Sequence, residues 1–144
     1  MPSELGDPRT DDVALGHLIA VVHQTGRDAL GRALRPLNLE TRHFAVLVAL
    51  DRHGPASQRR ISDLLDLDKS AMVRIMDELE RMGLAARARA EHDRRAYAID
   101  LTPEGRARAA AAAEVTAEVT AGLYGRLSGA ERDQLVALLA RLAP

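Results

Sequence analysis

Hydrogen-bond donors suited to DNA gather on one side of a predicted helix over residues 69–82. Helical spacing divides this segment into an apolar side and an outward side, and the outward side carries Ser70, Val73 and Arg74. An arginine can donate two hydrogen bonds to guanine O6 and N7 in the major groove, and a serine hydroxyl can reach a phosphate or a base edge. We therefore predict polar contacts to DNA from Arg74 and Ser70. The methyl groups of Ala71 and Val73 can add contacts to thymine.

A predicted basic hairpin follows this helix directly. Residues 84–90 and 95–101 are short and alternate with a period of two, as β-strands do, and residues 91–94 form a polar tip between them. An arginine at a hairpin tip can enter a narrow minor groove, where the negative potential is enhanced. We expect Arg94 to make that contact.

The hairpin decides between two interpretations of the segment. An ordinary amphipathic surface helix with a solvated charged face explains the helix alone about as well as DNA binding does. Four arginines on the hairpin make DNA binding the stronger interpretation, and we expect Asp93 and Arg95 to hold its shape by pairing within it or with a nearby helix. The predicted DNA-binding residues are Gln58, Arg59, Lys69, Ser70, Ala71, Val73, Arg74, Arg87, Arg94 and Arg95.

Capping residues mark the starts of the helices that must position these side chains. Asp68, the pair Thr102–Pro103, and Ser128 with Glu131 three residues later each suit a helix N-terminus. We predict a mainly α fold with a small β-hairpin wing. Its helices run over about residues 10–34, 39–52, 57–65, 69–82, 103–127 and 128–142.

Composition limits the class of protein. The 144 residues suffice for one domain, and because 47% are apolar but only one Phe and two Tyr are aromatic, its core must be aliphatic. We expect Ile61, Leu64 and Leu65 of the third helix to face that core. The absence of cysteine excludes disulfides and thiolate metal sites. Without a signal-peptide pattern or an apolar stretch that could span a bilayer, we expect a soluble cytoplasmic protein and no contact with membranes.

Three motifs carry a family resemblance. Asp-Lys-Ser at 68–70 opens the fourth predicted helix, and Asp-Glu-Leu-Glu-Arg-Met-Gly-Leu at 77–84 closes it. Asp-x-Arg at 93–95 is followed by Ile-Asp-Leu-Thr-Pro-Glu-Gly at 99–105. In these motifs, and over nearly its whole length, the chain resembles the MarR family of winged-helix transcriptional regulators.

The resemblance implies a homodimer whose DNA-binding lobe, a winged helix-turn-helix, spans residues 39–102. Residues 10–35 and 103–144 would form the dimerisation helices, and their apolar stripes exceed what one small lobe can bury. Two-fold symmetry then predicts a pseudo-palindromic operator in double-stranded DNA, with half-sites about one turn apart. The resemblance implies a repressor that a small-molecule ligand releases from this operator.

A second class of function stays open. Ala71 and Val73 occupy positions where the family often has threonine, and the net charge of the chain is −1, which argues mildly against binding phosphates. The alternative is a ligand-binding or interaction module of the same fold with weak or lost sequence-specific DNA binding. Motifs typical of enzymes, such as a glycine-rich phosphate loop or H-E-x-x-H, do not occur, so we expect no enzyme and no cofactor.

A small aromatic or anionic effector would fit the family pattern, in a cavity bordered by the first, second and fifth helices. The candidate residues for that cavity are His17, His23, Arg42, His43 and Phe44. For each histidine, capping or core hydrogen bonding is the simpler interpretation. Zinc could be imagined on His17, His23, Glu40 and His43, but their spacing matches no zinc site, so we expect no metal.

Overall fold

The computed structural model describes residues 12–90 and 93–144, and the side chains of residues 90 and 93–96 lie outside the described part. In chain order the elements are α1 (Asp12–Leu34), η1 (Arg35–Leu37), α2 (Thr41–His53), α3 (Gln58–Leu65), α4 (Lys69–Arg81), β1 (Ala85–Ala90), β2 (Asp93–Leu101), α5 (Pro103–Leu123) and α6 (Gly129–Leu142). The predicted mainly α fold with a small β-hairpin is confirmed.

Two predicted boundaries are wrong by a few residues. The helix α5 ends at Leu123 and not at residue 127, because a turn closed by the Leu127 N–H on the Tyr124 carbonyl follows it. The strand β2 begins at Asp93 and not at residue 95. A register shift after Arg89 pairs Ala90 with Asp93, so Asp93 and Arg94 belong to the strand and not to the tip.

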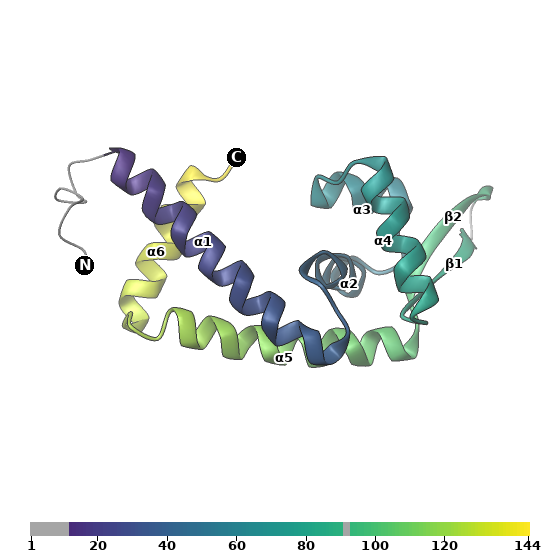
Figure 1. Cartoon of the computed structure of the whole chain (residues 1–144). Coiled ribbons are helices and arrows are strands. Elements are labelled where there is room, and N and C mark those ends of the chain that lie inside the picture. Colours follow the sequence, from purple (N-terminus) through teal and green to yellow (C-terminus); the bar gives the residue numbers. More distant parts are fainter. Residues whose placement is uncertain (1–11, 91–92) are drawn as a thin grey trace.

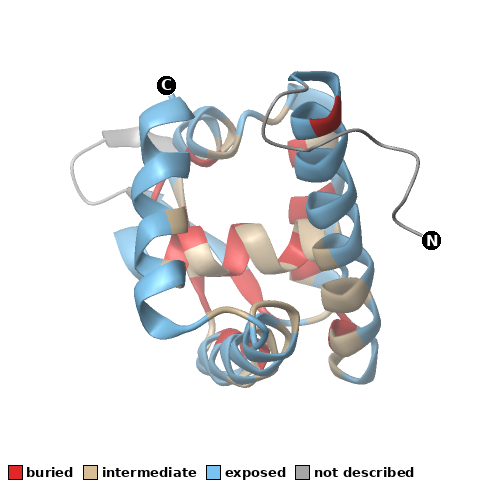
Figure 2. Ribbon diagram, turned by 90° about the vertical axis from the view of Figure 1, so that its left-hand side faces the viewer, coloured by how far each residue is buried: buried red, intermediate tan, exposed pale blue. Residues whose placement is uncertain are grey.

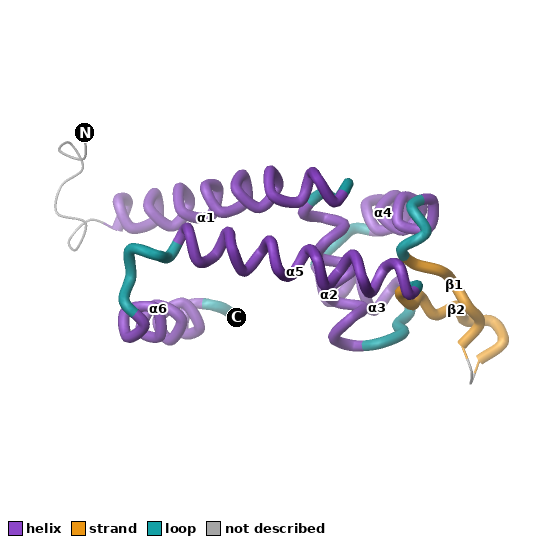
Figure 3. Tube along the Cα trace, turned by 90° about the horizontal axis from the view of Figure 1, so that it is seen from below, coloured by secondary structure: helices purple, strands orange, loops and turns teal. Residues whose placement is uncertain are grey.

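The helix α5 joins two parts of the molecule. It runs from the hairpin, along the bottom of the view in Figure 1, to the turn that leads into α6. At the hairpin end, α2, α3, α4 and the two strands form a lobe, while α1 and α6 lie toward the other end. Seen from below, α1 runs beside α5 (Figure 3). The lobe thus holds the predicted DNA-binding residues, and α1, α5 and α6 form its support.

The core of the lobe is aliphatic, as its composition predicts. Its fully buried side chains come from all three helices and from the hairpin, and the largest are Leu47, Leu50, Ile61, Met72, Ile75, Met76, Leu79, Leu84 and Ile99. The expectation for Leu64 is wrong, because 47% of its surface is exposed; α3 has eight residues and buries only Ile61 completely. Leu65 is partly buried against the same core, so α3 is anchored by Ile61 and Leu65.

The hairpin is fastened to the lobe near its base, on both strands. Ala56, in the loop before α3, exchanges two backbone hydrogen bonds with Ile99 of β2, at 3.0 and 2.8 Å. At the start of α5, the Thr102 N–H donates to the Leu84 carbonyl at 3.1 Å and the Thr102 hydroxyl donates to the Gly83 carbonyl at 2.6 Å. The first turn of α5 is thereby tied to the turn between α4 and β1.

The two terminal helices leave apolar side chains uncovered. No residue of α6 is buried, and α1 buries only Ala14 and Leu34 of its 23 residues (Figure 2). The uncovered aliphatic side chains include Leu15, Leu18, Ile19, Val21 and Val22 on α1 and Val136, Leu138, Leu139 and Leu142 on α6. In the part of the chain that the structure describes, no helix is both long and apolar enough to cross a membrane.

Candidate nucleic-acid interface

The helix α4 presents the outward face that its periodicity predicts. Met72, Ile75, Met76 and Leu79 are buried, and every side chain assigned to the opposite side is exposed. The exposed residues on that side are Lys69, Ser70, Val73, Arg74, Asp77 and Arg81, while Ala71 is half-buried at its edge. The side chains of Ser70, Val73 and Arg74 thus point away from the core.

The turn before α4 places this face beside α3. Asp66 adopts a left-handed conformation with φ of 51°, and the Leu67 N–H donates to the Ser62 carbonyl at 2.9 Å. The Asp68 side chain then caps α4 by accepting from the Ala71 N–H at 2.8 Å, as predicted. A short turn with a capped second helix is the helix-turn-helix arrangement, in which the second helix enters the major groove.

Arg87 of β1 contacts protein side chains on two elements. Its guanidinium lies 3.6 Å from Asp77 and 3.4 Å from Glu80, both on α4, and donates to Gln58 of α3 at 3.3 Å. The sequence assigned Arg87 and Gln58 to DNA, and that role stays a prediction; the structure brings the two side chains together within the lobe. Arg59 stays exposed on α3. The contacts of Arg87 tie the first strand of the hairpin to α4.

The wing residues fall at the edge of what the structure describes. Asp93, Arg94 and Arg95 are the first residues of β2, and their side chains lie outside the described part. Their predicted roles therefore stay predictions. The backbone of β2 pairs with β1, so that this strand continues from residues 93–95 to the start of α5.

A buried histidine joins α2 to α4. His43 Nδ1 accepts from the Glu40 N–H at 3.0 Å and so completes a capping box at the start of α2. Its Nε2 lies 2.6 Å from the Glu78 carboxylate of α4. The neutral tautomer with a proton on Nε2 fits both contacts, because Nδ1 must accept. His43 thus has the capping and core hydrogen-bonding role that was its simpler interpretation.

Arg42 binds the same carboxylate from the solvent side. Its guanidinium lies 3.2 Å from Glu78 and 2.9 Å from Glu40. The hydrogen bond from His43 lowers the pKa of Glu78; partial burial opposes this, and the charge of Arg42 adds to the lowering. Glu78 is therefore held as a carboxylate that links α4 to the start of α2.

This linkage predicts a pH-dependent stability difference for Glu78→Gln. A lowered folded-state pKa means that the carboxylate stabilises the fold above the ordinary glutamate pKa and that this contribution disappears as the pH falls through the lowered value. We expect the variant to be less stable by about 1 kcal/mol at neutral pH and to approach the wild type in acid. Urea unfolding at a series of pH values measures the difference.

The control is Glu114→Gln, which removes an exposed carboxylate of α5 that has no partner among the described residues. A stability difference for Glu78→Gln that stays constant from neutral to acid pH would contradict the assignment.

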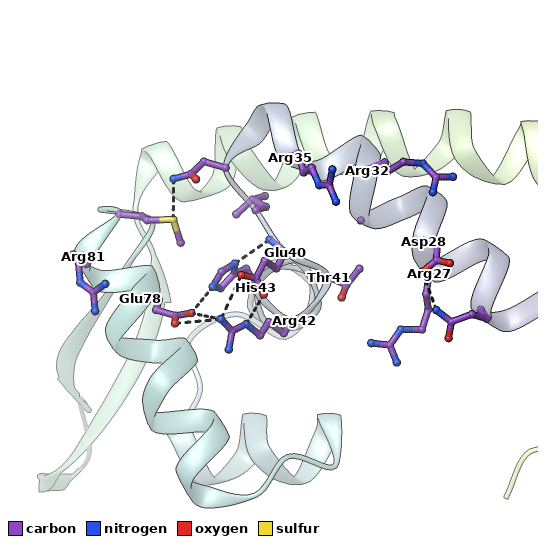
Figure 4. A pocket seen from close by; sticks show the side chains of 15 residues that line it. Arg27, Asp28, Arg32, Arg35, Glu40, Thr41, Arg42, His43, Glu78 and Arg81 are labelled. Carbon is purple, nitrogen blue, oxygen red and sulfur yellow. Dashed lines mark hydrogen bonds and ion pairs between the residues drawn. The ribbon is translucent and has the colours of Figure 1, made fainter.

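An open cleft of about 1080 Å³ lies beside this cluster, between α1, η1, α2 and α4 (Figure 4). Arg42 and His43 line it, but the other predicted effector residues do not. His17 and His23 are exposed farther back on α1, and Phe44 lines a separate groove of about 660 Å³ between α2, α5 and α6. The structure therefore does not place the five candidates around one cavity. The cleft borders α1, α2 and α4, whereas the predicted effector cavity was bordered by the first, second and fifth helices. No group of three potential metal ligands occurs within residues 12–90 and 93–144.

Comparison with known proteins decides the family. A model of the MarR family matches residues 37–96. The transcriptional repressor CouR, solved in complex with a 23-mer DNA duplex, is 30% identical and superposes with a TM-score of 0.83, covering 90% of this chain and 92% of that one. The chain belongs to the MarR family.

Two other proteins extend the comparison. BpsR of Bordetella bronchiseptica, whose DNA binding is regulated by 6-hydroxynicotinic acid, is 26% identical with a TM-score of 0.79 over 90% of this chain and 98% of that one. A Thauera aromatica protein named "Putative transcriptional regulatory protein for hcr operon" is 31% identical over 99 residues, which are 69% of this chain. The match spans 60% of the length of that relative.

Sequence reasoning missed several residues of this MarR-family site. Glu78 was treated only as part of a motif, and the arginines at 27, 32, 35 and 81 were not assigned to a cavity. The available signal was the concentration of arginines near the end of the first helix. It did not show which neighbouring element they would face, because the residues of α2 and α4 across the cleft are distant in the chain.

Proposed function

We propose that the chain is a homodimeric, sequence-specific DNA-binding transcriptional repressor that a small-molecule ligand releases from its operator. The observation that carries the proposal is the outward face of α4, where Ser70, Val73 and Arg74 are exposed next to the hairpin. The DNA-bound repressor CouR and the ligand-regulated BpsR support it by relationship. A protein with this function acts on DNA in the cytoplasm and needs no enzymatic activity or cofactor.

In this proposal the lobe over residues 39–102 binds DNA and the helices over 10–35 and 103–144 form the dimer. The uncovered aliphatic side chains of α1 and α6 favour that division, because unpaired apolar surface of this extent is typical of an interface. A two-fold axis would present the two α4 helices to successive major grooves of a pseudo-palindromic operator. Arg94 of each wing, on a hairpin whose shape Asp93 and Arg95 hold, is proposed to reach the adjacent minor groove.

Arg74→Ala is expected to weaken operator binding by about 1–3 kcal/mol, roughly fivefold to 150-fold, and to relax the base preference at one position of each half-site. The reason is the loss of a bidentate contact to guanine. Fluorescence anisotropy with the DNA upstream of the chain's own gene, and with single-base variants of it, measures both effects. Arg94→Ala should weaken binding to all these duplexes more uniformly.

The apolar side chains at Ala71 and Val73 favour the second candidate, a module that has lost sequence-specific binding. In that case affinity would be equal for the upstream DNA and a random duplex and would vanish by physiological salt. A salt titration with both duplexes separates the candidates. Equal affinities, or unchanged affinity in both arginine variants, would exclude the proposed function.

A further inference from the structure

The cleft between α1 and α4 is electropositive although the whole chain has a net charge of −1. Within residues 12–90 and 93–144, five arginines and three carboxylates line it, a local excess of two positive charges. The arginines come from three elements, α1, α2 and α4, and from the short helix η1 (Figure 4). They are Arg27, Arg32, Arg35, Arg42 and Arg81.

The carboxylates of the cleft do not neutralise most of these arginines. Asp28 accepts a hydrogen bond from Gln24 at 2.8 Å, and Glu40 and Glu78 both bind Arg42. The other four arginines have no ion-pair partner in residues 12–90 and 93–144. Unpaired guanidinium groups that share a concave site produce a positive potential able to attract anions.

The lining also indicates what kind of anion fits. Among the described residues that line it, Leu39 and Met82 are the only large apolar side chains, and none is Phe, Tyr or Trp. A flat aromatic acid gains most of its affinity from apolar cover, which this cleft supplies poorly. Guanidinium groups instead match carboxylate and phosphate oxygens in pairs.

We propose that this cleft binds a small hydrophilic polyanion, with several carboxylate or phosphate groups, through Arg27, Arg32, Arg35 and Arg81. Binding of the polyanion to the cleft does not depend on the proposed function. Only the effect of this binding on DNA rests on the proposed function. Within that function, the polyanion is the ligand that releases DNA.

Arg42 connects the cleft to α4. It lines the cleft and also holds Glu78, which lies one helical turn after Arg74 on α4. A polyanion that attracts Arg42 leaves Glu78 bound to His43 alone, at the 2.6 Å contact. The position of α4 then depends on whether the cleft is occupied, and by reciprocity DNA and polyanion each weaken the binding of the other.

The test is a calorimetric titration of the full chain with citrate, inorganic pyrophosphate and benzoate, without DNA. Citrate, pyrophosphate or both should bind saturably at millimolar concentration or below, and benzoate should bind much more weakly. Comparison of the two polyanions shows whether the cleft prefers carboxylate or phosphate groups.

Arg32→Gln and Arg35→Gln should each lower the affinity for the more tightly bound polyanion about tenfold, since each removes charge-assisted hydrogen bonds. Arg126→Gln, in the exposed turn between α5 and α6, should leave it unchanged.

Glu78→Gln tests the connection to α4. It removes the charge that competes for Arg42, so the polyanion should bind several-fold more tightly, whereas loss of a purely structural contact would not tighten binding. In anisotropy measurements, the tighter polyanion should lower operator affinity of the wild type.

Failure of both polyanions to bind, or tighter binding of benzoate, overturns the inference even if operator binding is specific. The inference is also overturned if Arg32→Gln lowers operator affinity when no polyanion is present. In that case the cleft would be a site for DNA phosphates. If the polyanion binds as expected but DNA binding is not sequence-specific, the cleft is a polyanion site and the proposed function is wrong.

Discussion

Leu139→Glu is expected to convert the protein to a monomer and to lower operator affinity by at least about a hundredfold. Leu139 is 45% exposed on α6, a helix of 14 residues that buries none of its own side chains within the chain. An isolated helix of this length is marginal in water, so the leucine stripe of α6 needs a partner to cover it. A glutamate in that interface would have to be buried without a counter-charge, which is strongly unfavourable.

The loss of DNA binding follows from the loss of the second lobe. In a dimer, binding of the first half-site makes the second contact intramolecular, an advantage of about 10²–10⁴ in affinity. Analytical ultracentrifugation measures the mass of the variant, and anisotropy measures its affinity for the upstream DNA. Circular dichroism should show that the lobe stays folded.

Ala137→Glu is the matched control, because helical spacing places this residue on the side of α6 opposite Leu139. It adds the same charge to the same helix and should leave the mass and the affinity unchanged. A wild-type protein that sediments as a monomer, or a dimeric Leu139→Glu variant with full affinity, would exclude the proposed role of α6.

Features set by neighbouring residues could be predicted from the sequence. The caps at Asp68, Thr102 and Ser128 depend on a side chain and an N–H group three residues apart, and all three occur as predicted. The two sides of α4 follow from its period of 3.6, which Met72 and Ile75 mark clearly. Local hydrogen bonding and periodicity therefore determine where α4 begins and which of its sides faces outward, before any tertiary contact is known.

Contacts between distant segments could not be predicted in this way. His43 and Glu78 are 35 residues apart, and nothing in either local pattern pairs them. Arg87 was assigned to DNA as one of the arginines of the hairpin, and that role stays a prediction; its proximity to two carboxylates of α4 could not be read from the local pattern. The cleft between α1 and α4 could not be predicted for a similar reason, since it depends on how these two helices face one another across the start of α2. The effector cavity expected at the fifth helix stays a prediction.

Gly105→Ala is expected to destabilise the fold by about 3 kcal/mol, because the added methyl group has no space. A Cβ atom at this position would lie 1.9 Å from the carbonyl oxygen of Leu84 and 2.8 Å from its carbonyl carbon. Both are backbone atoms of a fully buried residue, so no side-chain rotation can relieve the overlap. The start of α5 would have to move away from the turn between α4 and β1.

That movement would break contacts that position the hairpin. The Thr102 N–H bonds the same Leu84 carbonyl at 3.1 Å, and β1 begins one residue later at Ala85. Gly122→Ala is the control on the same helix, since a Cβ there meets nothing within 4 Å and alanine favours helix by up to about 1 kcal/mol. Urea unfolding should therefore give opposite signs for the two variants. Equal effects would mean that the close approach of α5 to Leu84 does not hold the wing in place.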